Sequence, residues 1–360
     1  MPRLPSRRYV TMDSPGIDEI SVYSARGNVY AIASPAFAYK LCGVPCNAPE
    51  AADFLLENGA RFANAVLERI PAAAIAMRQG RSPIDGIVLA PFRHHSPFDA
   101  VIINTDGTLA ERSGNGLTNL ARFLDDVSLI GNGQAFELRV HTGNGIVTET
   151  HGQAGKTDDL TGYWLAMGQI GFGASAVHAA RDRLIAADDK CFEVPPLRAF
   201  DPTWRRSVLV NVGNPHCVTF VDEPSQLPAN EDLRSTRYFD YLKEISYKPV
   251  SGVEEQSIFR QGINLQWAHV PPEGDAIHAR IFERGEGPTD SSGTSATAIT
   301  SAAHHIGLTR KTPVRVIMPG GTAVVEVSEM PSGTVARYFG VAERSGMYRS
   351  PHNAPTSAMP

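Results

Sequence analysis

Two short stretches of the sequence combine a serine, a glycine and the start of a helical pattern. The first runs from Ser113 to Leu124 (SGNGLTNLARFL) and the second from Ser292 to Ala303 (SGTSATAITSAA). Small residues at a helix start let a ligand approach the backbone, where the free N–H groups of the first turn and the positive end of the helix dipole favour an anion. Serine and glycine are also common helix caps, so either stretch alone is typical of an ordinary capped helix.

The two stretches repeat one pattern. Both place a threonine at the same offset, Thr118 and Thr297, and both continue with apolar residues at helical spacing. The expected buried faces consist of Leu117, Leu120, Ala121 and Leu124 in the first copy and Ala296, Ile299, Ala302 and Ala303 in the second. Because the pattern occurs twice, at Ser113 and at Ser292, and each copy follows a charged segment, we predict a duplicated fold with one helix per half directed at a shared site.

Composition limits the class of protein. A chain of 360 residues with 42% hydrophobic content predicts a globular protein of roughly two domains. A formal net charge of -5 and the lack of a long Lys/Arg block argue against nucleic acid as the partner. No apolar run approaches the roughly 18 residues that span a bilayer, so we expect no membrane association. The basic start has no apolar region after it, so we expect no secretory signal.

The four cysteines show no zinc-type spacing. Cys42 and Cys46 lie close together, but Cys191 and Cys217 do not form a second pair. We therefore expect reduced thiols in a cytoplasmic protein and no metal site.

Strand-like runs surround both helical stretches. Each half is expected to contain strands, a glycine-rich turn, a helix and then a hairpin, which makes the class α+β. Residues 174–187 are expected to form a helix. The predicted organisation is an N-terminal arm (1–26), a first domain (27–165), an irregular linking segment (166–206), a second domain (207–342) and a disordered tail (343–360). A cleft between two facing domains is the expected ligand site.

Several polar motifs resemble, in their order and spacing, those of the diaminopimelate epimerase family, within the wider group that includes proline racemase and the methylaconitate isomerases. The motifs are Gly27-Asn28; Asp85-Gly86; Asn104-Thr-Asp-Gly107; Glu111-Arg-Ser-Gly-Asn-Gly116; Gly213-Asn-Pro-His216; Asn264; Glu283-Arg-Gly-Glu-Gly-Pro-Thr289; and Ser-Gly-Thr294. The resemblance covers most of residues 27–340. It implies two homologous domains, each a barrel-like wrap of strands around a central helix, with the active-site cleft between them. It also implies inversion of an amino-acid α-carbon without pyridoxal phosphate, any other cofactor or a metal.

The resemblance implies a catalytic set with one departure from the family. Family members remove the α-proton with one thiolate and return a proton from a thiol on the opposite face, whereas this chain has Ser113 and Ser292 at those two positions. A hydroxyl is a far poorer acid than a thiol and needs a neighbouring base. His216 is the best candidate base because imidazole titrates near neutrality, and Glu283 completes the catalytic set. Glu111 and Asp290, each two residues before a serine, are expected to be first-turn carboxylates favoured by the helix dipole.

The resemblance also implies a set of substrate-binding residues. They are Asn28, Asn104, Gly114, Asn115, Asn214, Asn264, Arg284, Gly293 and Thr294. Arg284 with Glu283 would clamp a zwitterion, with guanidinium on carboxylate and carboxylate on ammonium.

The expected function is that of a cofactor-independent isomerase, an amino-acid epimerase or racemase that acts on a small amino acid or related carboxylate. Two alternatives stay open. One is a lyase, dehydratase or double-bond isomerase of a hydroxy or unsaturated acid, and the other is a catalytically silent ligand-binding homologue. The sequence leaves room for a homodimer and carries no specific signal for one.

Overall fold

The computed structural model describes residues 19–71, 82–110, 113–157, 160–249 and 254–349. The helices are α1 (Pro35–Cys42), α2 (Ala48–Leu67), α4 (Gly114–Asp126), α5 (Pro195–Phe200), α6 (Asn230–Arg234), α7 (Thr236–Ser246) and α8 (Gly293–His305), with the short turns η1 (Ser175–Val177), η2 (Arg181–Arg183), η3 (Pro224–Gln226) and η4 (Glu254–Gln256). The first group of strands is β1 (Glu19–Ala25), β2 (Asn28–Ala33), β3 (Gly86–Leu89), β4 (Phe98–Asn104), β5 (Ala135–His141), β6 (Val147–Thr157) and β7 (Leu160–Gln169). The remaining strands are β8 (Gly171–Phe172), β9 (Ile185–Ala186), β10 (Phe192–Glu193), β11 (Arg206–Asn211), β12 (Pro215–Phe220), β13 (Asn264–His269), β14 (Ala276–Glu283), β15 (Gly287–Thr289), β16 (Val314–Met318), β17 (Gly321–Met330), β18 (Gly333–Gly340) and β19 (Glu343–Arg349).

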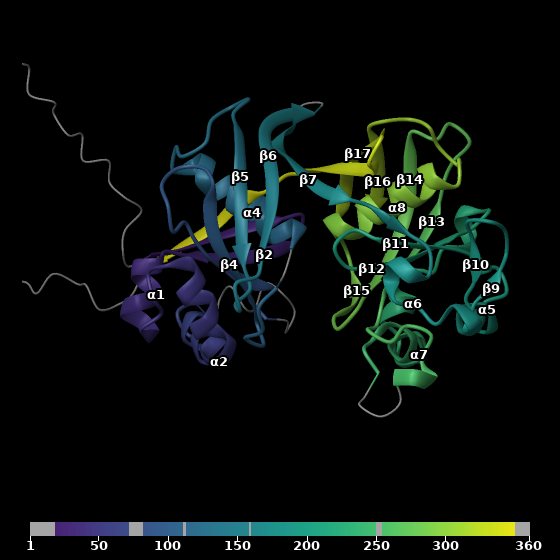
Figure 1. Ribbon diagram of the computed structural model, residues 1–360, viewed down its shortest axis with the longest axis horizontal. Coiled ribbons are helices and arrows are strands. Elements are labelled where there is room, and N and C mark those ends of the chain that lie inside the picture. Colours follow the sequence, from purple (N-terminus) through teal and green to yellow (C-terminus); the bar gives the residue numbers. More distant parts are fainter. Residues whose placement is uncertain (1–18, 72–81, 111–112, 158–159, 250–253, 350–360) are drawn as a thin grey trace, which may run out of the picture.

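The strands pair in an order that occurs twice. In the first half, β1–β2 is antiparallel, β2–β3 parallel, β3–β4 antiparallel and β4–β5 parallel, and β5, β6 and β7 form an antiparallel meander. In the second half, β11, β12, β13, β14, β16, β17 and β18 follow the same succession of directions. The two sets join where β7 pairs with β18, and they form the left and right parts of the molecule in Figure 1. This repeated order is what a duplicated fold predicts.

Each set of strands surrounds one central helix. Helix α4 contacts β1, β2, β3 and β7, and helix α8 contacts β11, β12, β13, β16 and β17. The predicted apolar faces are confirmed, because the side chains of Leu117, Leu120, Ile299 and Ala302 are all fully buried. The shared threonines also act alike: Thr118 Oγ1 donates to the Gly114 carbonyl at 2.7 Å and Thr297 Oγ1 donates to the Gly293 carbonyl at 2.8 Å.

The hydrophobic core divides along the chain in the same way. Two buried clusters draw their residues from between Ile20 and Leu165, and two others draw theirs from between Met167 and Tyr338. We propose that the boundary between the two domains lies at this change. In the described part of the chain, no helix has the length and apolar character needed to cross a membrane.

Three local expectations were wrong. Residues 174–187 contain the turns η1 and η2 and the start of β9 instead of one helix. The segment 166–206 is more than a link, because Val177, Leu197 and Trp204 are buried in a core cluster of the second half. Residues 19–25 and 343–349, expected in a loose arm and a disordered tail, form β1 and β19, which pair with each other. Figure 1 shows the yellow C-terminal strand lying among the strands of the first half.

Candidate active site

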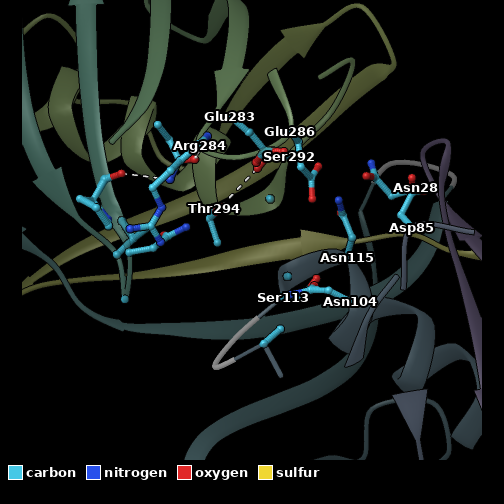
Figure 2. A pocket seen from close by; sticks show the side chains of 18 of the residues that line it. Asn28, Asp85, Asn104, Ser113, Asn115, Glu283, Arg284, Glu286, Ser292 and Thr294 are labelled. Atoms are coloured by element: carbon cyan, nitrogen blue, oxygen red, sulfur yellow. Dashed lines mark hydrogen bonds between the residues drawn. The ribbon is translucent and has the colours of Figure 1, made fainter. Parts of the chain in front are cut away.

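A polar cavity of about 550 Å³ is lined by residues of both halves. It brings together most of the residues predicted from the sequence. Those that line it are Asn28, Asn104, Ser113, Gly114, Asn115, Asn214, Asn264, Glu283, Arg284, Ser292, Gly293 and Thr294. Figure 2 shows side chains from the two halves directed toward one another across this space.

The two central helices begin at this cavity. Ser113 is the N-cap of α4, where its Oγ accepts the Gly116 N–H at 3.0 Å, and Ser292 is the N-cap of α8, where its Oγ accepts the Ser295 N–H at 3.3 Å. The glycines that follow are almost in contact, since a Cβ added to Gly114 would lie 3.7 Å from the Gly293 Cα. Two helix N-termini, each with unpaired first-turn N–H groups and a positive dipole end, therefore meet at one site.

Ser113 has a tyrosine as its neighbour. The Tyr30 hydroxyl and Ser113 Oγ lie 2.9 Å apart. Burial raises the pKa of Tyr30 well above its ordinary value, so the phenol stays protonated at neutral pH. Tyr30 can donate a hydrogen bond to Ser113 and cannot remove its proton.

Ser292 has a carboxyl group as its neighbour. Burial raises the pKa of Glu283, while hydrogen bonds from the hydroxyls of Ser292 and Thr289 act in the opposite direction. The Ser292 hydroxyl also lies 3.2 Å from Thr294 Oγ1 (Figure 2). Ser292 is thus the serine with an acid–base partner, whereas Ser113 has a phenol.

Several predicted binding residues also stabilise the walls of the cavity. Asn28 Nδ2 donates to the Ser291 carbonyl at 3.0 Å and so ties the first half to the loop before α8. Asn264 Nδ2 donates to the Pro215 carbonyl at 3.0 Å, and its Oδ1 accepts the Arg284 N–H at 2.9 Å. Asn115 is different, because its buried Oδ1 has no hydrogen-bond partner among the described residues. A ligand donor in the cavity would satisfy this oxygen.

His216 does not line the cavity, which corrects its assignment as the base that serves a serine. It is fully buried on β12, and burial lowers its pKa to about 3. Gln266 Nε2 donates to His216 Nδ1 at 2.9 Å, so the neutral ring carries its proton on Nε2 and donates it to Asn214 Oδ1 at 2.8 Å. Both ring nitrogens are therefore used, and the contact positions Asn214, which does line the cavity.

Of the two carboxylates expected in the first turns of the helices, the structure describes Asp290 and not Glu111. Asp290 forms an ion pair with Arg234 at 2.8 Å and lies outside the lining of this cavity. Glu111 lies outside the described residues.

The lining residues that the predicted site set does not contain include Tyr30, Asp85, Glu286 and His178. Tyr30 follows Asn28 by two positions on β2, so strand alternation could have placed both on one face. Asp85 stands in a recognised motif, and Glu286 stands between two glycines just after Glu283. Nothing in local sequence indicates that these residues face one cavity.

None of the four cysteines, all of which are described, lines the cavity. Burial raises the pKa of Cys217 to about 12, which fits a core residue and not a nucleophile. In the described ranges, no group of three or more His, Cys, Asp or Glu side chains is arranged to hold a metal ion. The chemistry of the cavity is therefore that of hydroxyls, amides, carboxyls, one guanidinium and the imidazole of His178.

Comparison with known proteins agrees with this architecture. The sequence model described as diaminopimelate epimerase matches residues 208–344. Diaminopimelate epimerase 1 of Nostoc sp. (strain PCC 7120) is 30% identical over 248 residues, which cover 68% of this chain and 77% of that protein. The diaminopimelate epimerase of Synechococcus elongatus is 29% identical over 279 residues, which cover 77% of this chain and 88% of that protein.

A solved structure extends the similarity in fold to nearly the whole chain. The phenazine biosynthesis protein of the PhzF family from Bacillus anthracis aligns with a TM-score of 0.54 at 14% identity, covering 92% of this chain and 98% of that one. Together with the paired helix starts and the repeated strand order, these matches place the chain in the diaminopimelate epimerase family.

Proposed function

We propose that this protein is a cofactor-independent isomerase of the racemase or epimerase type that acts at the α-carbon of a small amino acid or related carboxylate. The observation that carries the proposal is the meeting of two helix N-termini in one polar cavity, with Gly114 against Gly293. Membership of the family adds to it, because the relatives quoted above bear the name diaminopimelate epimerase.

The electrostatics of the cavity suit this reaction. The α-proton of a carboxylate is a very weak acid, so its removal requires stabilisation of the negative charge that spreads into the carboxylate oxygens. Backbone N–H groups at two helix starts can donate to these oxygens without reorganisation. Ser292 and Thr294, both nearly buried, add hydroxyl donors at the same point.

Arg284 and the asparagines are proposed to hold the rest of the substrate. The guanidinium reaches the cavity while its Nη1 donates to the Gln261 carbonyl at 2.8 Å, which fixes its direction. Asn115 and Asn214 would bind the polar groups of the ligand. Glu283, beside Ser292, is proposed to accept an ammonium group or to exchange a proton with the serine.

Hydrogen exchange in deuterium oxide tests this function. L- and D-amino acids and small dicarboxylic acids are first screened for an increase in melting temperature, and each acid that binds is incubated with the protein in deuterium oxide. We expect incorporation of deuterium at the α-carbon together with inversion of configuration. Binding without any exchange would leave only a ligand-binding role.

A second candidate is a double-bond isomerase, lyase or dehydratase of a hydroxy or unsaturated acid. It is favoured by one observation: serines occupy both helix starts, and Ser292 has a carboxyl as its neighbour whereas Ser113 has a phenol that stays protonated. A reaction that needs one proton carrier suits such an unequal pair. Loss of water or movement of a double bond, with no inversion, would identify this reaction.

A further inference from the structure

Glu286 occupies a turn that projects into the cavity from the second half. It stands between β14 and β15, whose pairing holds the turn, and the flanking glycines have φ of 89° at Gly285 and 83° at Gly287. A Cβ added to Gly287 would lie 2.6 Å from the Phe239 ring, so the backbone is tightly packed on one side. The Glu286 side chain is left exposed on the other side, and Figure 2 shows its carboxyl directed toward Asn115 of the first half.

The position of Glu286 connects two spaces. Glu286 lines the cavity of about 550 Å³ described above and also a neighbouring cavity of about 720 Å³. Asn28 and Asp85 likewise line both cavities, so these three residues form part of the wall between them. A group at this shared wall can contact a ligand in the main cavity and exchange protons with water in the neighbouring one.

The other two carboxyls that line the cavity are already engaged. Glu283 accepts hydrogen bonds from Ser292 and Thr289, and Asp85 accepts the Val29 N–H at 2.7 Å. His216 is buried behind Asn214. Glu286 is the lining carboxyl whose side chain has no hydrogen-bond partner among the described residues.

The charges around Glu286 support a role in proton transfer. Glu283 and Arg284 face it from the end of β14, Asp85 from the start of β3, Tyr30 from β2 and Tyr247 from the end of α7. Although part of the side chain is exposed, desolvation by the surrounding cavity wall, followed by the charges of Glu283 and Asp85, raises the pKa of Glu286 to about 7. A carboxyl of this pKa is present in both protonation states at neutral pH, as a general acid–base group requires.

We infer that Glu286 is the residue that takes the α-proton of the substrate. The inference rests on the proposed function. In the step, the C–H bond breaks and a Glu286 carboxylate oxygen binds the proton. The electron pair stays on the substrate and spreads into its carboxylate, which the two helix starts stabilise. Ser113 acts as a hydrogen-bond donor, while the Glu283–Ser292 pair proposed above returns a proton to the α-carbon, and Glu286 releases the proton it took to water.

The test compares deuterium exchange in the wild type and in Glu286→Gln, with the panel of amino acids and dicarboxylic acids named above. The amide keeps the size of the side chain and removes its basicity. We expect exchange to fall by roughly 10²–10⁴-fold, the usual contribution of a general base, while ligand-induced melting shifts remain. Glu244→Gln, on the exposed face of α7, is the matched control and should exchange like the wild type.

Two further measurements separate a catalytic role from a structural one. Exchange by the wild type should rise with pH through about 7, and Asp85→Asn should move this rise to lower pH because it removes a charge that raises the pKa of Glu286. Formate should restore exchange to Glu286→Ala, since it can supply the missing carboxylate.

The outcomes are distinct. A wild type that exchanges its substrate, together with a Glu286→Gln variant that exchanges equally fast, overturns this inference and leaves the proposed function intact. A wild type that binds acids and exchanges none of them overturns both.

Discussion

The hydroxyls of Ser113 and Ser292 have different neighbours, and this difference governs what each residue can do. Ser113 lies 2.9 Å from the Tyr30 hydroxyl, while Ser292 contacts the half-buried Glu283 carboxyl. A phenol of raised pKa can only donate or accept a hydrogen bond, whereas a carboxyl of raised pKa can also exchange a proton. We therefore expect the two serines to respond differently when their neighbours are changed.

Replacing Tyr30 by Phe should weaken the site without unfolding the protein. The lost hydrogen bond leaves Ser113 Oγ with the Gly116 N–H and without its phenol partner, and we expect exchange to slow roughly 10-fold, which corresponds to about 1.4 kcal/mol. Tyr23→Phe is the matched control, because the Tyr23 hydroxyl also makes one side-chain hydrogen bond, to Asp126 at 2.9 Å, but does not line the cavity. Deuterium exchange and melting temperature would be measured for both. Equal slowing in both variants would mean that Tyr30 acts only through stability.

His216 should make stability depend on pH in a defined direction. Burial lowers its pKa from 6.5 to about 3, so below pH 6.5 the unfolded chain binds a proton that the folded protein does not. The free energy of unfolding contributed by this residue therefore falls as the pH is lowered, by at most about 1.4 kcal/mol per pH unit.

Urea unfolding between pH 4 and 7 would compare the wild type with His216→Gln. The raised pKa values of Glu283 and Glu286 act in the opposite direction, because their stabilising effect is lost as the pH rises, but they are present in both proteins. The wild type should lose more stability than the variant on acidification. Parallel curves would show that His216 titrates normally in the folded state.

At the level of elements, the two helix starts are packed unequally although their sequences match. A Cβ added to Gly293 would lie 3.0 Å from Tyr338 Cε1, whereas one added to Gly114 would be 3.7 Å from its nearest atom. The Tyr338 ring is held in place, because it is buried and its hydroxyl accepts a hydrogen bond from Arg26 Nη1 at 2.8 Å. The start of α8 is therefore the less tolerant of the two.

Gly293→Ala should destabilise the protein and Gly114→Ala should not. Overpacking against a fixed ring is expected to cost about 1–3 kcal/mol, while alanine at the Gly114 position fits at ordinary contact distance. The free energy of unfolding in urea would be measured for both variants. A similar cost at both positions would contradict the unequal packing.

At the level of the whole molecule, the C-terminal strand returns to the first half. β19 follows β18 of the second half and pairs with β1 between Glu19 and Ser24, so the chain crosses between the halves again after β7. This pairing, with the contact between Asn28 and the Ser291 carbonyl, links the walls of the cavity.

Removing β19 should therefore destabilise the first half in particular. A chain that ends at Ala342 loses the β1–β19 pairing and exposes β1 as an edge strand, at a cost of about 1 kcal/mol for each lost backbone hydrogen bond. A chain that ends at Arg349 keeps the strand and serves as the control. We expect a lower melting temperature for the shorter chain and faster amide hydrogen exchange in β1 and β2. Equal melting temperatures of the two chains would contradict a structural role for β19.

The sequence by itself determined the features that depend on neighbouring residues. The N-caps, the glycines after them and the apolar spacing predict α4 and α8, because caps and helical periodicity act within one or two turns. The repeated motif predicts the duplication, and twelve of the thirteen predicted site residues line the cavity. These residues reach one cavity because many of them stand at the ends of strands and helices whose ends meet there.

Only the tertiary structure decided the features that arise between distant segments. His216 and Asn214 stand two positions apart, yet the wrap of the sheet buries one and leaves the other at the cavity. The pKa of Glu286 depends on Asp85, which a different half of the chain contributes. The place of β19 depends on the open edge of β1, more than 300 residues earlier in the chain. Burial and charge are set by the total surroundings of a group, and only folding brings those surroundings together.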